Sequence, residues 1–309
     1  MTEAKKARHV GRWLLSLALL LMSLWGGVYA KQHQWLDRGW FNLLFWWESL
    51  PQGIAGVWLN DYQVLLDAVE LPDVHGLSDV QYDPERQALW ALVDHPAELL
   101  LVSLQGQVLA RTRLLGLEDA EALTLVAPGR LVVADERVQR LLDVQLENLQ
   151  ARLTVDSLPN LTLGVARNGN KGFEGLAWDS STEQLWVAKE RDPKQLFTVK
   201  GFPYSGQENL VVDDDAERNR RLFMRDISGL HFDGASGHLL VLSDESQLLL
   251  EVDRAGRPKS SLSLRRGAAG LKAAVPQAEG VSMDEAGNLY LVSEPNLLYV
   301  FARRKAPAG

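Results

Sequence analysis

Short apolar runs alternate with polar turns along most of this chain, and one arrangement recurs. The sequence FEGLAWDSSTEQLWVAKE, residues 173–190, gives an apolar strand, a polar turn and a second apolar strand, and AEGVSMDEAGNLYLVSE repeats this order over residues 278–294. Alternation with a period of two is typical of β-strands, and Asp, Gly and Ser between two such runs indicate a hairpin. The two segments therefore predict the same β-hairpin twice.

Three further segments follow the same order. They are DISGLHFDGASGHLLVLSDES (226–246), DAEALTLVAPGRLVVADER (119–137) and, more loosely, GLSDVQYDPERQALWALVDHP (76–96). Equivalent positions near the start of the first strand are separated by 43, 53, 54 and 51 residues, and they are Ser78, Glu121, Glu174, Ser228 and Glu279. One or two more strands follow each hairpin, so each unit has the strand content of a β-propeller blade.

The two ends of the repeat region predict how the ring closes. The last unit supplies only three strands, and the segment before the first unit, Tyr62 to Leu71, is an isolated strand without a hairpin of its own. If this strand completes the last blade, no sheet edge stays exposed. The sequence therefore predicts an all-β, five-bladed β-propeller over residues 61–304, closed by an N-terminal strand and followed by a short tail, 305–309.

The first sixty residues have a different character. Four basic residues precede an uncharged run from Trp13 to Ala30, whose eighteen residues are near the lower limit for crossing a bilayer. The basic segment before an apolar span usually stays in the cytoplasm, so we expect everything after Lys31 to lie on the opposite side of the membrane. Residues 1–30 form either a retained anchor or a signal segment cleaved after the small residues of VYA. Residues 31–60 are a Trp-rich juxtamembrane linker, which either lies on the membrane surface or packs on the domain.

Composition restricts the classes of function. The chain has 40 acidic and 32 basic residues, a net charge of −8 and no cysteine. The negative charge argues against nucleic-acid binding, which needs a basic surface, and is compatible with a protein that collects cations. The absence of cysteine excludes disulfides and thiolate metal sites.

The repeats also place acidic residues at both ends of each hairpin. An antiparallel hairpin returns to the end where it began, so residues that start the first strand lie beside residues that finish the second. The first set was given above, and the second set is Asp94, Glu136, Glu190, Asp244 and Glu294. We expect all ten to surround one mouth of the central channel, which we call the acidic mouth.

Carboxylates this close raise one another's pKa unless a cation compensates their charge. Calcium accepts carboxylate, carbonyl and water oxygens in a loose shell, so it tolerates ligands from separate blades. We predict Ca²⁺ at the acidic mouth with Glu121, Glu174 and Glu279 as direct ligands. Further candidate ligands are Glu190, Glu294, Asp226 and Asp119.

The alternative interpretation of these acids is structural. Basic residues beside them could neutralise several through ion pairs, and propeller blades also use Asp and Glu to cap strands and turns. The neighbouring bases are Arg137, Lys189, Arg191 and Arg225. The charged run DDDAERNRR, 213–221, is predicted to be a solvated loop because it lacks the glycine and spacing of an EF-hand.

The runs FEGLAWD, LWVAKER, DISGLHFD, LLVLSDES and QAEGVSMDEAGNLYLVSEPN resemble the SdiA-regulated, YjiK-like family of bacterial envelope proteins. The resemblance covers about residues 60–304, and it implies a five-bladed propeller, distantly related to NHL repeats, with a calcium site and no settled activity. It also implies a single-pass inner-membrane protein with a periplasmic propeller, or a cleaved periplasmic form.

Two functions remain open. The first is a module that binds a small molecule or a protein at the acidic mouth. The second is a calcium-dependent lactonase or esterase with the metal in the central channel and a spare carboxylate such as Glu190 as general base.

Overall fold

A computed structural model describes residues 3–32, 56–146, 150–164, 172–204 and 209–304. The chain divides into two units, 1–52 and 53–309. In the first unit, α1 (Glu3–Gln32) contains the apolar run Trp13–Ala30, which is long and apolar enough to cross a membrane or to serve as a signal sequence. Most of the predicted Trp-rich linker and the whole 305–309 tail lie outside the described residues.

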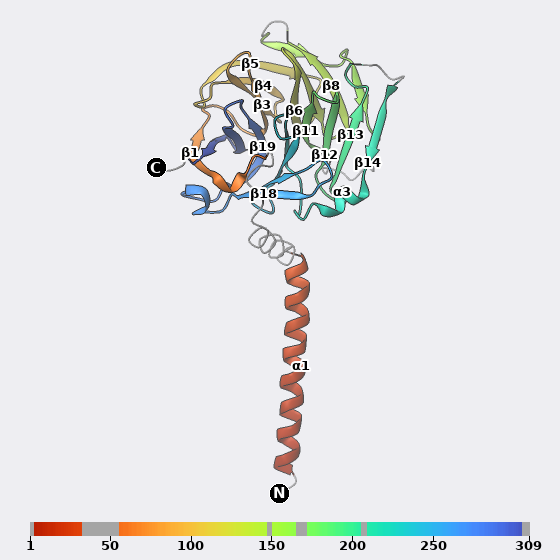
Figure 1. The fold of residues 1–309 in the computed structure, drawn as a ribbon, viewed down its shortest axis with the longest axis vertical. Coiled ribbons are helices and arrows are strands. Elements are labelled where there is room, and N and C mark those ends of the chain that lie inside the picture. Colours follow the sequence, from red (N-terminus) through yellow and green to blue (C-terminus); the bar gives the residue numbers. More distant parts are fainter. Residues whose placement is uncertain (1–2, 33–55, 147–149, 165–171, 205–208, 305–309) are drawn as a thin grey trace. The chain divides into compact units, whose positions relative to one another are not determined.

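The second unit consists of five sheets whose strands are antiparallel apart from one added strand, which confirms the predicted five-bladed propeller (Figure 1). Blade 1 contains β2 (Leu77–Asp83), β3 (Ala88–Val93), β4 (Glu98–Val102) and β5 (Val108–Leu115). Blade 2 contains β6 (Ala120–Ala127), β7 (Arg130–Asp135), β8 (Arg140–Gln145) and β10 (Asn160–Thr162). Blade 3 contains β11 (Phe173–Asp179), β12 (Gln184–Lys189), β13 (Gln195–Lys200) and β14 (Val211–Asp214).

The remaining two blades complete the ring. Blade 4 contains β15 (Gly229–Asp233), β16 (His238–Ser243), β17 (Leu248–Val252) and β18 (Pro258–Ser263). Blade 5 contains β19 (Gln277–Met283), β20 (Leu289–Glu294), β21 (Leu297–Arg303) and β1 (Tyr62–Glu70). The 3-10 helices η1 (Leu59–Asp61) and η3 (Ala268–Gly270) lie in the connections.

The closure of the ring follows the prediction. Strand β1 pairs antiparallel with β21, with Tyr62 opposite Arg303 and Glu70 opposite Leu297. Figure 1 shows β1, in orange, among the blue strands of the C-terminal blade. The first strand of the propeller thus completes the last blade, and the open edge of that blade is covered.

The first strand of each blade lies innermost, and these strands contact one another in the circuit β2, β6, β11, β15, β19 and back to β2. Their backbones approach closely, which explains a repeated glycine. A Cβ atom on Gly280 would lie 2.6 Å from Cα of Asp79, and one on Gly229 would lie 2.7 Å from the carbonyl oxygen of Glu279. Glycine at these positions lets neighbouring inner strands meet.

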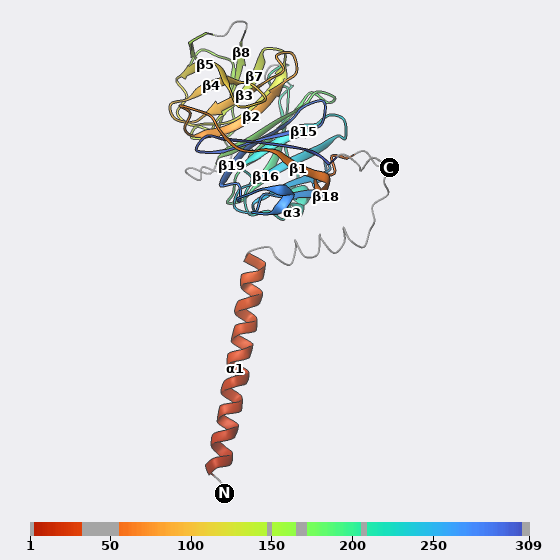
Figure 2. The same cartoon turned by 90° about the vertical axis from the view of Figure 1, so that its left-hand side faces the viewer.

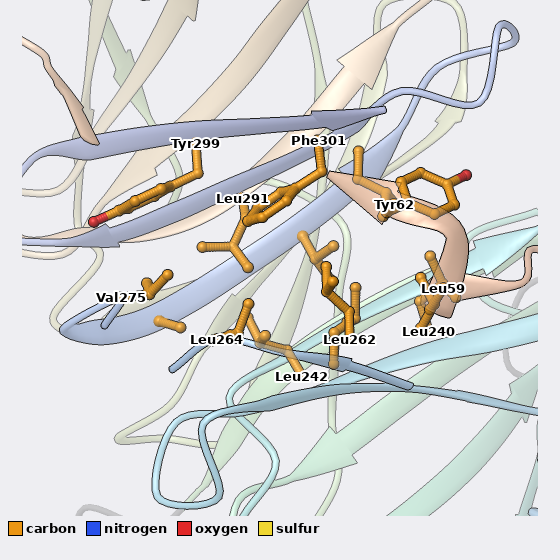
Figure 3. Packing of buried hydrophobic residues seen from close by; sticks show 14 of the residues in the cluster. Leu59, Tyr62, Leu240, Leu242, Leu262, Leu264, Val275, Leu291, Tyr299 and Phe301 are labelled. Atoms are coloured by element: carbon orange, nitrogen blue, oxygen red, sulfur yellow. The ribbon is translucent and has the colours of Figure 1, made fainter. Parts of the chain in front are cut away.

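Apolar side chains fill the spaces between the blades. The largest described cluster joins blades 4 and 5, and Figure 3 shows Leu291 and Phe301 facing Leu242 and Leu264. Similar clusters lie between blades 1 and 2, 5 and 1, and 2 and 3. Every fully buried Leu or Phe contributes about 1.5–3 kcal/mol. All buried hydrophobic residues of the described chain lie between Val57 and Phe301, so residues 31–309 contain the whole described core.

The segment that enters the propeller is fixed by a buried carboxylate. Glu251 of β17 is fully buried and accepts hydrogen bonds from the backbone N–H of Val57 (2.8 Å) and Trp58 (3.0 Å). His238 Nδ1 lies 2.7 Å from the same carboxylate. Glu251 therefore connects the chain that leads into β1 with blade 4.

Two features depart from the sequence prediction. Strand β9 (Arg152–Thr154) adds to blade 1 as a fifth strand, parallel to β5, before the chain returns to blade 2. The predicted loop 213–221 instead contains the end of β14 and the helix α3 (Ala216–Arg221), which contacts β13 and is labelled in Figure 2. The loop prediction was wrong because Asp215 caps this helix by accepting from the N–H groups of Glu217 and Arg218.

Candidate metal centre

The first set of mouth residues begins the inner strands, and in most blades it occupies a β-bulge. In blade 3, Phe173 pairs with Lys189 and Gly175 pairs with Ala188, so Glu174 is an extra residue without a partner. The same interruption occurs at Ser78, Glu121 and Glu279. A bulge bends the strand locally and re-aims the side chain of the extra residue.

The second set lies at the end of the second strand of each hairpin. Glu190 comes directly after β12, and its N–H donates to the carbonyl of Gly172 (3.0 Å). Glu136 follows β7 in the same way, and its N–H donates to the carbonyl of Asp119 (2.8 Å). These backbone hydrogen bonds hold Glu136 and Glu190 beside the start of their own inner strands.

The structure brings nine of the ten predicted residues together in one cavity of about 330 Å³. They are Asp94, Glu121, Glu136, Glu174, Glu190, Ser228, Asp244, Glu279 and Glu294. The cavity therefore contains every residue that we named as a candidate calcium ligand, including Asp226 and Asp119. The exception is Ser78, which is buried but does not line the cavity.

Two groups of carboxylates are close enough to share one ion. Oxygen atoms of Asp119, Glu121 and Glu136 lie within 4.8 Å of one another, and so do those of Glu136, Glu174 and Glu190. Glu136 belongs to both groups and is almost fully buried. Glu279, Glu294 and Asp226 line the same cavity without belonging to either group.

Burial and mutual repulsion raise the pKa of several glutamates in this cavity. Burial, with Glu136 and Asp119 nearby, raises the pKa of Glu121 to about 9. Burial raises the pKa of Glu279 to about 8 and the pKa of Glu190 to about 7, the latter against the opposing effect of Arg191. Burial and the charge of Glu121 raise the pKa of Glu174 well above its ordinary value. A bound cation would remove this penalty on the charged forms.

The basic neighbours compensate only part of this charge. Arg137 lies 3.3 Å from Asp119, and Arg191 pairs with Glu190 (3.0 Å) and Glu245 (2.7 Å). Lys189 donates to the backbone carbonyl of Pro193 (3.2 Å). Within the described residues, no ion pair reaches Glu121, Glu136, Glu174 or Glu279. The structural interpretation therefore accounts for the acids at the rim of the cavity, whereas these four glutamates form no ion pair with a described residue.

Hydrogen bonds give two other acids a structural role. Asp226 accepts from the hydroxyl of Ser243 and from the N–H of Glu245 (3.2 Å), and Asp244 accepts from the N–H of Ala278 (3.2 Å). These bonds join successive loops around the mouth. Asp226 has fewer free lone pairs than the glutamates, so it is a weaker candidate ligand than its position in the sequence indicates.

Sequence reasoning placed Glu136 at the mouth but did not select it as a ligand. The structure makes it central, because its Oε1 accepts from the N–H of Gly172 (2.5 Å) in the next blade while it belongs to both carboxylate groups. Gly172 itself is required there, since a Cβ would lie 2.6 Å from Cγ of Glu136. The only signal in the sequence was the position of Glu136 at the end of its hairpin.

Several solved structures are similar to this chain. The luciferin-regenerating enzyme is 12% identical with a TM-score of 0.48, covering 78% of this chain and 94% of that one. A chain of the nidogen/laminin complex is 16% identical with a TM-score of 0.47, covering 71% and 73%. Streptogramin B lyase is 7% identical with a TM-score of 0.46, covering 81% and 100%. At these identities the likeness concerns the fold alone.

A family model gives the assignment that these structures do not. The model of the SdiA-regulated family matches residues 55–302, from the segment that enters the propeller to the end of β21. This range contains all five blades and the whole acidic mouth. The protein therefore belongs to the SdiA-regulated family.

Proposed function

We propose that this protein is a calcium-binding β-propeller whose acidic mouth binds a small molecule or a protein. The observation that carries the proposal is the pair of carboxylate groups that share Glu136, each with three oxygens within 4.8 Å. Their centre has only oxygen donors, which suit a hard divalent cation such as calcium. The pKa of Glu121, raised to about 9, supports the same conclusion, because this carboxyl carries its full charge at neutral pH only beside a cation, and the pKa of Glu174 is raised in the same direction.

Glu121, Glu136 and Glu174 would hold the ion, with Glu190 and Asp119 completing the shell from either side. Glu279 and Glu294 would then face the ligand across the cavity. Their charge favours partners that present cationic groups or that offer oxygen atoms to the bound ion. Such a mouth serves recognition without further chemistry.

A calcium titration of thermal stability tests the metal site. A ligand that binds only the folded state raises its Tm with concentration. We expect calcium to raise the Tm of residues 31–309, and Glu174→Gln to remove most of the increase. Glu70→Gln, an exposed change on β1, is the matched control and keeps the full response. A wild-type Tm that does not change with calcium concentration would contradict the proposal.

A second candidate function is a calcium-dependent lactonase or esterase. It is favoured by Glu190, which lines the cavity beside Glu174 and Glu136 and could act as general base for an attacking water. A bound calcium would polarise the substrate carbonyl. The test is a panel of lactones and esters with and without calcium. Turnover that needs calcium and disappears in Glu190→Gln, with calcium binding retained, would establish the enzyme.

We also propose that α1 retains the protein at the inner membrane with the propeller in the periplasm. The uncharged run Trp13–Ala30 behind a basic head supports this location. Carbonate extraction of membranes separates the alternatives, since an anchored chain stays in the pellet and a cleaved chain is released. Protease digestion of spheroplasts, with intact cells as control, reports on which side the propeller lies.

A further inference from the structure

The central channel has a second mouth at the opposite end of the inner strands. The acidic mouth lies where these strands begin, and the second lies where they end, among the hairpin turns that contain Pro84, Ser180, Ala235 and Ala286. We call it the turn-side mouth. Its cavity measures about 830 Å³, within the range of about 300–1,000 Å³ that small-molecule sites occupy.

One polar side chain on the floor of this cavity forms no hydrogen bond or ion pair with a described residue. The floor is formed by Gln81, Leu125, His231 and Met283, all half-buried. The Gln81 amide donates to the carbonyl of Tyr82 (3.1 Å) and to the hydroxyl of Ser282 (3.3 Å). The ring of His231 makes no hydrogen bond to any residue that the structure describes. Burial lowers the pKa of His231 to about 4, against the effect of Asp233, so the imidazole is neutral at neutral pH.

The charge of the turn-side mouth is negative. Asp233, Asp284 and Glu285 line it, and none of the three forms an ion pair with a described residue. Asp233 and Asp284 accept from neutral groups of their own hairpins, such as the N–H of Ser236 (3.0 Å) and the hydroxyl of Tyr290 (2.9 Å).

The one basic residue of the lining does not reverse this charge. Arg303 is held by the carbonyls of Gly56 (2.9 Å) and Val57 (2.8 Å) and stacks over Tyr62. Its guanidinium is therefore committed to the segment that enters the propeller. A ligand in this cavity therefore meets a neutral imidazole and carboxylates that form no ion pair with a described residue.

We propose that the turn-side mouth binds a small organic cation, an ammonium group on an apolar body. The ammonium would donate to the free imidazole nitrogen of His231 and lie near the carboxylates of Asp233 and Glu285. The apolar body would contact Leu125 and Met283. An anion of the same shape would face repulsion, and a neutral analogue would lose the charge attraction.

Three probes with one indole body and different charge test this proposal. They are tryptamine (cation), tryptophol (neutral) and indole-3-acetate (anion), titrated into residues 31–309 by calorimetry. The imidazole ¹⁵N signals of the five histidines in residues 31–309, followed by NMR in the same titrations, report which ring is contacted. We expect tryptamine to bind about tenfold or more tightly than either analogue and to shift the His231 signals most.

Variants locate the binding. His231→Phe keeps an aromatic ring and removes the nitrogen atoms, so it weakens tryptamine binding by about tenfold, whereas exposed His75→Phe leaves binding unchanged. Glu174→Gln, at the acidic mouth, also leaves it unchanged, which separates this site from the proposed calcium site. Equal affinity for the three probes, no binding of any probe, or full binding by a folded His231→Phe would overturn the proposal.

Discussion

Replacing Glu279 by Gln should alter how the stability of the metal-free propeller depends on pH. Glu279 is an extra residue in the bulge of β19, and burial raises its pKa from 4.5 to about 8, with Glu294 and Asp244 adding repulsion and Gln277 opposing the shift. A carboxyl with a raised pKa binds its proton more tightly in the folded state. Its contribution to stability is complete below pH 4.5 and is lost as the pH rises toward 8.

The size of the effect follows from this interval. Each pH unit between the unfolded and folded pKa costs about 1.4 kcal/mol for one group. Between pH 4.5 and pH 7 the Glu279 carboxyl therefore lowers the free energy of unfolding by about 3 kcal/mol. Glutamine has nearly the same shape as the protonated acid and does not titrate, so Glu279→Gln removes this loss.

Urea unfolding of chelator-treated residues 31–309, followed by tryptophan fluorescence, measures the difference. We expect the stability gain of Glu279→Gln over wild type to grow by about 3 kcal/mol from pH 4.5 to pH 7. Glu70→Gln, on the exposed outer strand, should show no such growth. If the gain of Glu279→Gln is the same at both pH values, the acidic mouth is less desolvated than its geometry indicates and the reasoning fails.

Two further predictions concern the ring and its entry segment. Gly280→Ala should destabilise the propeller by about 1–3 kcal/mol in urea unfolding, because the added Cβ would lie 2.6 Å from the backbone of Asp79. Gly234→Ala, with open space around it, is the control and should have little effect. Equal destabilisation by the two substitutions would contradict the close approach of the inner strands. Glu251→Ala should lower the free energy of unfolding by about 3–5 kcal/mol, because it leaves the N–H of Val57 and other buried donors unsatisfied. A decrease below 1 kcal/mol would show that apolar contacts hold the segment that enters the propeller instead.

The sequence was sufficient for the architecture because the fold repeats. Five hairpins with the same order, an isolated strand before Leu71 and a three-stranded last unit determined the number of blades and the way the ring closes. Repetition also predicted where the acidic residues lie, since a position identified in one hairpin identifies the equivalent positions in the other four. Single exceptions were harder to predict. The parallel strand β9 depends on a partner, β5, that is nearly forty residues away in the chain.

The arrangement inside the acidic mouth depends on local geometry that periodicity does not show. Four first-set residues occupy bulges, and a bulge shifts the strand register by one residue. The alternation of apolar and polar residues therefore does not predict to which face of the strand the side chain of Glu174 or Glu121 points. The central role of Glu136 depends on the N–H of Gly172 in the next blade. The helix α3 was missed because six residues are too few for a helical period, and only its Asp215 cap marks it.

A crystal structure of residues 31–309 grown with calcium, with anomalous scattering used to identify the ion, tests the central claim most directly. We predict one calcium ion about 2.3–2.6 Å from carboxylate oxygens that include Glu136 and at least one of Glu121 and Glu174. An acidic mouth that holds only water at millimolar calcium, or an ion bound elsewhere on the propeller, would contradict the account.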